Sequence, residues 1–211
     1  MISYRKFIQF TLPWLALAVV MNLVRYYYVD TASYIWMNWN LFLGLVPLLF
    51  LFLFEKSKNI YLRVFYFLAW LFFLPNAPYM VTDLIHLRDV GPQWLLWFDG
   101  MMIFAYSLAG VFILGFTLIR MQRLLFKESK KKNIFLLAVS VLVSFGIYLG
   151  RYVRWNTWHI VTKPGDITTN VLDILQTEYA NPVFLMTLIF FTLFVVVTVK
   201  SLRWVFLKST N

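Results

Sequence analysis

Three side chains that could perform acid–base or metal chemistry stand close together in an otherwise apolar sequence. Asp83 and His86 are three residues apart in the stretch FLPNAPYMVTDLIHL, so a helix would place them on one face. Asp99 follows soon after, at the end of the WFD stretch. If the two carboxylates and the imidazole converge, they could bind a divalent metal ion that activates water or polarises a phosphoryl oxygen. Without a metal, they could act as acid and base.

Each of these residues also has a structural explanation. Asp83 could cap a helix that begins near Thr82. Asp99 would sit favourably in the first turns of its helix, and a backbone carbonyl could satisfy His86. Ionisable groups at membrane depth are costly, however, which favours a functional polar cluster over three unrelated side chains.

A second group of polar residues lies in the stretch GIYLGRYVRWNTWH, at residues 146–159. Arg151 and Arg154 carry guanidinium groups, whose fork geometry suits bidentate contacts to carboxylate or phosphate. They could hold a lipid-linked phosphate or the two aspartates, or they could simply extend to the membrane surface. Asn76 and Asn156 could add contacts to a ligand, or they could close a turn and cap a helix.

Composition predicts the elements that position these residues. Of 211 residues, 62% are hydrophobic and only 13% are charged, which is typical of a membrane protein. Six segments are close to the roughly 17 to 25 residues that a helix needs to cross a bilayer. They are residues 7–25, 36–54, 60–74, 94–119, 133–150 and 182–206. We therefore expect residues 1–211 to form one all-α membrane domain, a polytopic transmembrane helix bundle with about six spanning helices and short interfacial or re-entrant helices on the outer face.

The PNAP sequence at residues 75–78 interrupts the third segment. Its two prolines predict that the helix stops near Leu74, and Thr82 and Asp83 could cap a short new helix that runs to Leu87. Non-helical backbone at membrane depth must be buried in protein or face water, so we expect this turn to line a cavity. A further amphipathic run between residues 167 and 179 predicts a helix that lies flat on the outer surface.

Charge predicts the orientation. Lys and Arg are enriched in cytoplasmic loops, and one orientation, with both termini inside, places most basic residues on that side. The cluster from Arg120 to Lys132 is explained in this way and by contact with anionic lipid head groups, so the net charge of +10 requires no nucleic-acid partner. The sequence has no cysteine, which excludes cysteine catalysis and thiolate metal sites.

Three stretches in order, FLPNAPYMVTDLIHL, WFD and GIYLGRYVRWNTW, together resemble a bacterial integral-membrane family called Domain of Unknown Function family 1361. The resemblance implies a protein of the bacterial plasma membrane and implies no activity, substrate or cofactor. The polar positions of the family pattern match Asn76, Tyr79, Asp83, His86, Asp99, Arg151, Arg154 and Asn156. The pattern has an aspartate where this sequence has His159, so His159 is a poor candidate for an essential ligand.

Two functions are compatible with these residues. The first is an enzyme at the outer leaflet, in which the aspartates and the histidine bind a metal or transfer protons while the arginines hold a phosphate-bearing lipid or envelope precursor. The second is a non-catalytic membrane module, such as a binding subunit, a permease component or an envelope assembly factor. In the module Asp83, Asp99, Arg151 and Arg154 form a partly buried structural network, in which Asp99 pairs with Arg151. A transporter is less well supported, because the charged residues lie near one surface instead of the bilayer midplane.

Overall fold

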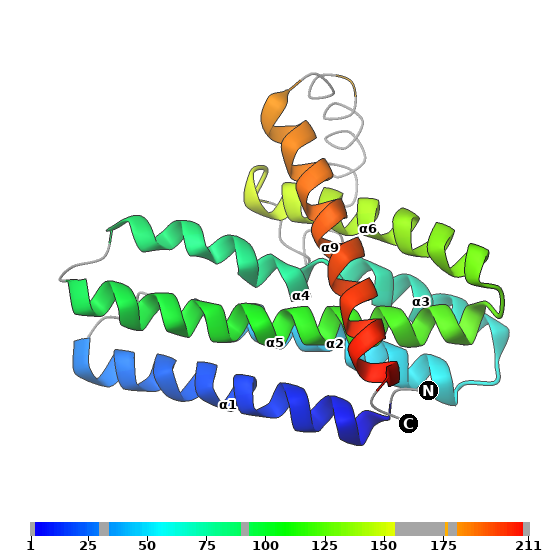
Figure 1. The fold of residues 1–211 in the computed structure, drawn as a ribbon, viewed down its shortest axis with the longest axis horizontal. Helices are drawn as coiled ribbons and strands as arrows, with labels where there is room; N and C mark the ends of the chain where they lie inside the picture. Colours follow the sequence, from blue (N-terminus) through cyan, green and yellow to red (C-terminus); the bar gives the residue numbers. More distant parts are fainter. Residues whose placement is uncertain (1–2, 30–33, 90–92, 155–175, 177–180, 209–211) are drawn as a thin grey trace.

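The computed structural model describes residues 3–29, 34–89, 93–154, 176 and 181–208, and within these ranges it contains helices and no strand. Figure 1 shows a bundle in which most helices run along the long axis of the molecule. The elements are α1 (Tyr4–Val29), α2 (Trp36–Lys56), α3 (Ile60–Phe73), α4 (Asn76–Tyr79), the 3-10 helix η1 (Met80–Asp89), α5 (Gln93–Leu125), α6 (Ser129–Arg151) and α9 (Pro182–Lys208).

Six segments of this bundle are long and apolar enough to cross a membrane, which confirms the predicted fold class. They are Tyr4–Val29, Trp36–Lys56, Ile60–Leu87, Gln93–Leu125, Ser129–Arg151 and Pro182–Trp204. The main difference from the expected boundaries is in the third segment. It runs past residue 74 to Leu87, because the chain continues beyond the PNAP turn without reversing direction (Figure 1).

The PNAP turn breaks the hydrogen-bond pattern of the third span but not its path. Pro75 and Pro78 have no backbone N–H, and α3 ends at Phe73, close to the predicted position. The side-chain amide of Asn76 donates to the carbonyl of Phe73 at 2.9 Å and replaces a lost backbone bond. The single turn α4 and the helix η1 then continue beside α5. The short helix expected after the turn is therefore η1, and it extends the span instead of folding back.

Glycines on neighbouring helices make room for the PNAP turn. A Cβ atom on Gly110 of α5 would lie 2.0 Å from the carbonyl oxygen of Ala77, and one on Gly146 of α6 would lie 2.5 Å from Cγ of Pro75. Gly44 of α2 approaches Ala77 from a third helix. The turn is therefore enclosed by protein, which satisfies the requirement for irregular backbone within a membrane. The cavity expected at this turn stays a prediction.

The central helix of the bundle is α5, which contacts α1, α2, α4, η1, α6 and α9. The last helix, α9, crosses α5 and α6 at a steep angle instead of running alongside them (Figure 1). Gly115 of α5 permits this crossing, because a Cβ atom there would lie 2.2 Å from Cδ1 of Leu202. Where α9 passes α6, the hydroxyls of Ser144 and Thr192 share a hydrogen bond of 3.1 Å.

Replacing Gly110 by alanine should destabilise the protein, because the new Cβ atom would overlap the backbone of Ala77. Overpacking of this kind costs about 1–3 kcal/mol, and a backbone atom cannot rotate away. Gly100 is the matched control in the same helix, since a Cβ atom there would meet only Cδ1 of Leu87 at 3.9 Å. Gly100→Ala should therefore leave stability unchanged or raise it by up to about 1 kcal/mol. Thermal unfolding in detergent micelles compares the variants, and equal midpoints would contradict the packing described here.

Candidate functional site

Arg151, at the end of α6, is the centre of a polar cluster. Its guanidinium forms an ion pair with Asp83, and Nε donates to Oγ1 of Thr82 at 2.9 Å. Nη1 lies 3.2 Å from Nε2 of His86. The side-chain amide of Asn40, from α2, donates to the second oxygen of Asp83 at 3.5 Å. These five residues form the Arg151 cluster, which joins α6, η1 and α2.

Local packing directs Arg151 towards η1. The guanidinium carbon lies 4.6 Å from the centre of the Tyr79 ring, within the range of a cation–π interaction. Gly150 lets this ring approach α6, because a Cβ atom there would lie 3.0 Å from Cε2 of Tyr79. The hydroxyl of Thr82 donates to the carbonyl of Tyr79 at 2.6 Å and accepts from Arg151. Thr82 and Asp83 therefore bind a cation from α6 instead of capping a helix.

Burial differs strongly within the Arg151 cluster. The side chain of Asp83 has no exposed surface and that of Arg151 is 14% exposed, whereas His86 is exposed. A buried carboxylate is costly unless it is paired and hydrogen-bonded. Arg151 contacts one oxygen of Asp83 and Asn40 contacts the other, so both oxygens are satisfied by protein.

Arg25 of α1 is the centre of a second polar cluster. Its Nε lies 2.5 Å from Oδ1 of Asp99 on α5, and the two side chains are 7% and 0% exposed. The guanidinium carbon lies 4.5 Å from the centre of the Tyr34 ring. Asn22, about one turn earlier in α1, donates to the backbone carbonyl of Tyr34 at 2.8 Å. These four residues form the Arg25 cluster, which joins α1, α5 and the start of α2.

Tyr34 connects the two clusters. Its ring packs against Arg25, and its hydroxyl donates to the backbone carbonyl of His86 at 3.0 Å. The ring of Trp36 lies edge-on to the His86 ring, with 5.2 Å between centroids. The segment that opens α2 therefore contacts a residue from each cluster.

A line of amides extends the Arg25 cluster into the bundle. The side-chain amide of Asn38 donates to Oδ1 of Asn22 at 3.2 Å. The hydroxyl of Tyr106, on α5, donates to Oδ1 of Asn38 at 2.6 Å. Such polar contacts between spanning helices add to the packing that holds a membrane bundle together.

The structure does not bring the three proposed metal ligands to one point. Asp83 and His86 belong to the Arg151 cluster, whereas Asp99 belongs to the Arg25 cluster. Within the part of the chain that the structure describes, no three His, Asp or Glu side chains form a group that could hold a metal ion. Because Asp99 contacts Arg25, the pairing of Asp99 with Arg151 expected from the sequence is wrong.

The other predicted ligand-binding residues lie in separate places. Arg154 is exposed, has a left-handed backbone with φ of 58° and belongs to neither cluster. Asn76 bonds within the PNAP turn, and Tyr79 packs against the guanidinium of the first cluster. Asn156, His159 and the amphipathic helix predicted at 167–179 lie outside the described residues.

Sequence reasoning missed Arg25 as the partner of Asp99. A signal was present, because Arg25 lies near the end of α1 that the predicted orientation places outside, where the positive-inside rule disfavours arginine. Asn22, Asn38 and Asn40 are polar residues within apolar spans, and such residues often form contacts between helices. The pairing itself could not be deduced from local pattern, because 74 positions separate Arg25 from Asp99.

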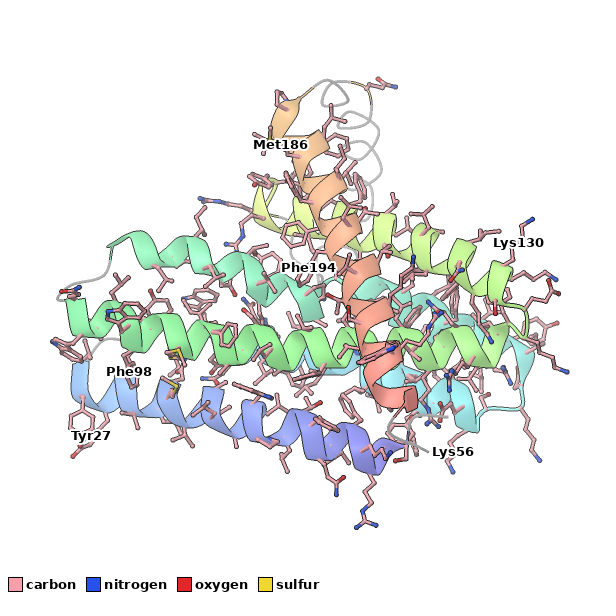
Figure 2. All side chains as sticks on the ribbon, viewed as in Figure 1. Tyr27, Lys56, Phe98, Lys130, Met186 and Phe194 are labelled. Atoms are coloured by element: carbon pink, nitrogen blue, oxygen red, sulfur yellow. The ribbon has the colours of Figure 1, made fainter. Side chains whose placement is uncertain are left out.

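A third ion pair lies at the opposite end of the bundle, where Figure 2 shows Lys56 far from Tyr27. Nη2 of Arg120, on α5, donates to Oε2 of Glu55 at 2.8 Å, and its guanidinium carbon lies 4.3 Å from the Tyr4 ring centre. The hydroxyl of Tyr4 also donates to Glu55, at 3.2 Å. Arg120 was expected to contact lipid head groups, but it joins α1, α2 and α5.

Breaking the ion pair of Asp83 and Arg151 should destabilise the protein. Removing one partner leaves the other charge buried and uncompensated, at a cost of roughly 3–5 kcal/mol. We expect Asp83→Leu and Arg151→Met each to lower the unfolding midpoint. The double variant should lose less stability than the sum of the losses in the two single variants. A double-mutant cycle of thermal unfolding in micelles measures this coupling, expected at about 1–3 kcal/mol.

The exposed pair of Glu128 and Lys131 is the control for this cycle. Their charged atoms are 2.7 Å apart, but the side chains are 63% and 58% exposed. Such pairs contribute about 0–1 kcal/mol, so Glu128→Gln should hardly change the midpoint. Fully additive losses for the Asp83 and Arg151 variants would show that these two side chains do not interact.

Comparison with known proteins places the chain in a family. Searches of curated proteins and of solved structures found no match. A protein-family model described as "Protein of unknown function (DUF1361)" matches residues 39–197. The whole Arg151 cluster lies inside this range, whereas Arg25 precedes it. Because the match covers most of the sequence, the chain belongs to the DUF1361 family of proteins of unknown function.

Proposed function

We propose that the protein is a non-catalytic membrane module whose charged residues hold its helices in one arrangement. One observation supports this most directly: Asp83 and Asp99 are both fully buried, and each is paired with an arginine from another helix. A substrate or a metal ion would have to displace the arginine that each carboxylate already contacts. Such a module would serve as a binding subunit, a permease component or an assembly factor of the cell envelope.

The energetics of a membrane interior support the same role. Packing one helix on another gains little from the hydrophobic effect in lipid, so close packing and polar contacts supply the specificity. An isolated charge there is expensive, which makes a wrong arrangement of helices costly. Arg25 ties α1 to α5, and Arg151 ties α6 to η1.

An enzyme is the second candidate, and one observation favours it. Oδ2 of Asp99 is buried and has no hydrogen-bond partner among the residues that the structure describes. A buried carboxylate oxygen without a donor is unusual and calls for an explanation. In an enzyme, Asp99 would take up a proton during hydrolysis or transfer on a phosphate-bearing lipid or envelope precursor.

For the orientation, we propose a bacterial plasma membrane with both termini in the cytoplasm. The start of α1 and the end of α5 lie together, since Tyr4 contacts Arg120. Arg203 of α9 donates to Gln122 at 2.5 Å, which adds the C-terminal part of α9 to this end. The basic loops after α2 and α5 lie there too and would contact anionic lipid head groups (Figure 1). The Arg25 and Arg151 clusters would then lie towards the outer face.

Exchanging Arg25 and Asp99 tests the proposed function. Arg25→Asp with Asp99→Arg keeps an ion pair, whereas either single variant places like charges together and should lower the unfolding midpoint. Each variant is then expressed in a strain that lacks the endogenous gene. If the pair is structural, the double variant should restore the trait that the deletion altered. A double variant that is as stable as the wild type but restores nothing would favour the enzyme.

The absence of cysteine makes the orientation testable with single labelled positions. Arg154 and Lys131 are exposed at the opposite ends of α6. We expect Arg154→Cys to react with a membrane-impermeant maleimide in intact spheroplasts, and Lys131→Cys to react only after permeabilisation. The reverse pattern of labelling would place the termini outside.

A further inference from the structure

His86 differs from the other members of the Arg151 cluster because its side chain is exposed. Two contacts hold its ring in place. The ring of Trp36 packs against it, and Nε2 lies 3.2 Å from Nη1 of Arg151. The backbone carbonyl of His86 also accepts the hydroxyl of Tyr34, which fixes this turn of η1. His86 is thus a positioned side chain on the surface and not a freely rotating one.

Arg151 determines which ring nitrogen of His86 carries the proton. An arginine side chain can only donate hydrogen bonds, so Nε2 must accept and must hold a lone pair. In the neutral imidazole the proton then resides on Nδ1. Because the two nitrogens face different directions from the ring, this N–H is directed away from Arg151. No contact of Nδ1 to a described residue is present.

Exposed apolar residues that neighbour His86 and Arg151 along the chain indicate what this donor would meet. Leu84 and Ile85 are 43% and 45% exposed, and Tyr152 at the end of α6 is 53% exposed. In a segment that spans a membrane, exposed apolar side chains of this kind face lipid. A ligand that reaches His86 along this surface must therefore be apolar over most of its length and carry a hydrogen-bond acceptor. A membrane lipid with a phosphate head group has this chemistry.

We propose that His86, held by Arg151 as the Nδ1–H tautomer, donates a hydrogen bond to the phosphate of a membrane lipid that lies along η1. Phosphate oxygens are strong acceptors, and the neighbouring guanidinium favours an anion. This lipid site goes beyond the proposed function. It is exposed, and it does not require that the buried ion pairs have a purely structural role. It also differs from a site made by Arg151 and Arg154, since Arg151 is directed at η1.

NMR of ¹⁵N-labelled histidine tests the tautomer. The chain has two histidines, so His159→Gln leaves only the signal of His86. In full-length protein in maltoside micelles, which contain no phosphate, Nδ1 should be protonated and Nε2 should not. Arg151→Met should abolish this preference. A predominantly Nε2–H form of His86 while Arg151 is present would overturn the assignment.

Titration of the same sample with short-chain phosphatidylglycerol tests the ligand. The Nδ1 signal of His86 should shift saturably, and inorganic phosphate at equal concentration should cause no shift. Lys131→Ala, at the other end of α6, is the matched control and should give the same titration. Native mass spectrometry of His86→Phe should show one tightly bound lipid fewer than the wild type. An unchanged Nδ1 signal with lipid, or an equal shift with inorganic phosphate, would contradict a lipid site.

Discussion

A charge inside an apolar bundle needs an opposite charge close by, and the arrangement of these helices depends on that requirement. Asp83 and Asp99 are both fully buried, and each meets an arginine from a helix distant in the sequence. Tyr34 contacts one cluster through its ring and the other through its hydroxyl, so the two ion pairs are linked. The ends of five elements on this side of the bundle are thereby held by one connected set of polar contacts.

The irregular third span makes the Arg151 cluster possible. In a 3-10 helix, residues three apart lie directly above one another, whereas in an α-helix they are offset. Asp83 and His86 have this spacing in η1, and both contact the same guanidinium. The PNAP turn starts this change of helix type, and the glycines beside it let three other helices approach the turn. The proline pair is therefore part of what positions the site.

The sequence predicted the spans well because apolar length and proline position are local properties. The same holds for Asp83 and His86, whose shared face follows from their spacing. The partners of the aspartates could not be predicted in this way. Which charges pair depends on how the helices pack, and no local sequence pattern indicates that packing. Arg25 was given no partner, and Asp99 was assigned to the wrong arginine. The interfacial helix was expected because a proline pair usually ends a span, but here glycines on α5 and α6 allow the chain to continue in line.

The order of the charged residues along the chain has a consequence for biosynthesis. Arg25 is made 74 residues before Asp99, and Asp83 is made 68 residues before Arg151. At typical elongation rates of about 5–20 residues per second, each first partner waits on the order of ten seconds for its second. During that interval α1 and η1 carry a charge without its final counterion. The nascent helices must therefore remain near water or within the insertion machinery until α5 and α6 are made. The two helices of each ion pair would then enter the lipid together.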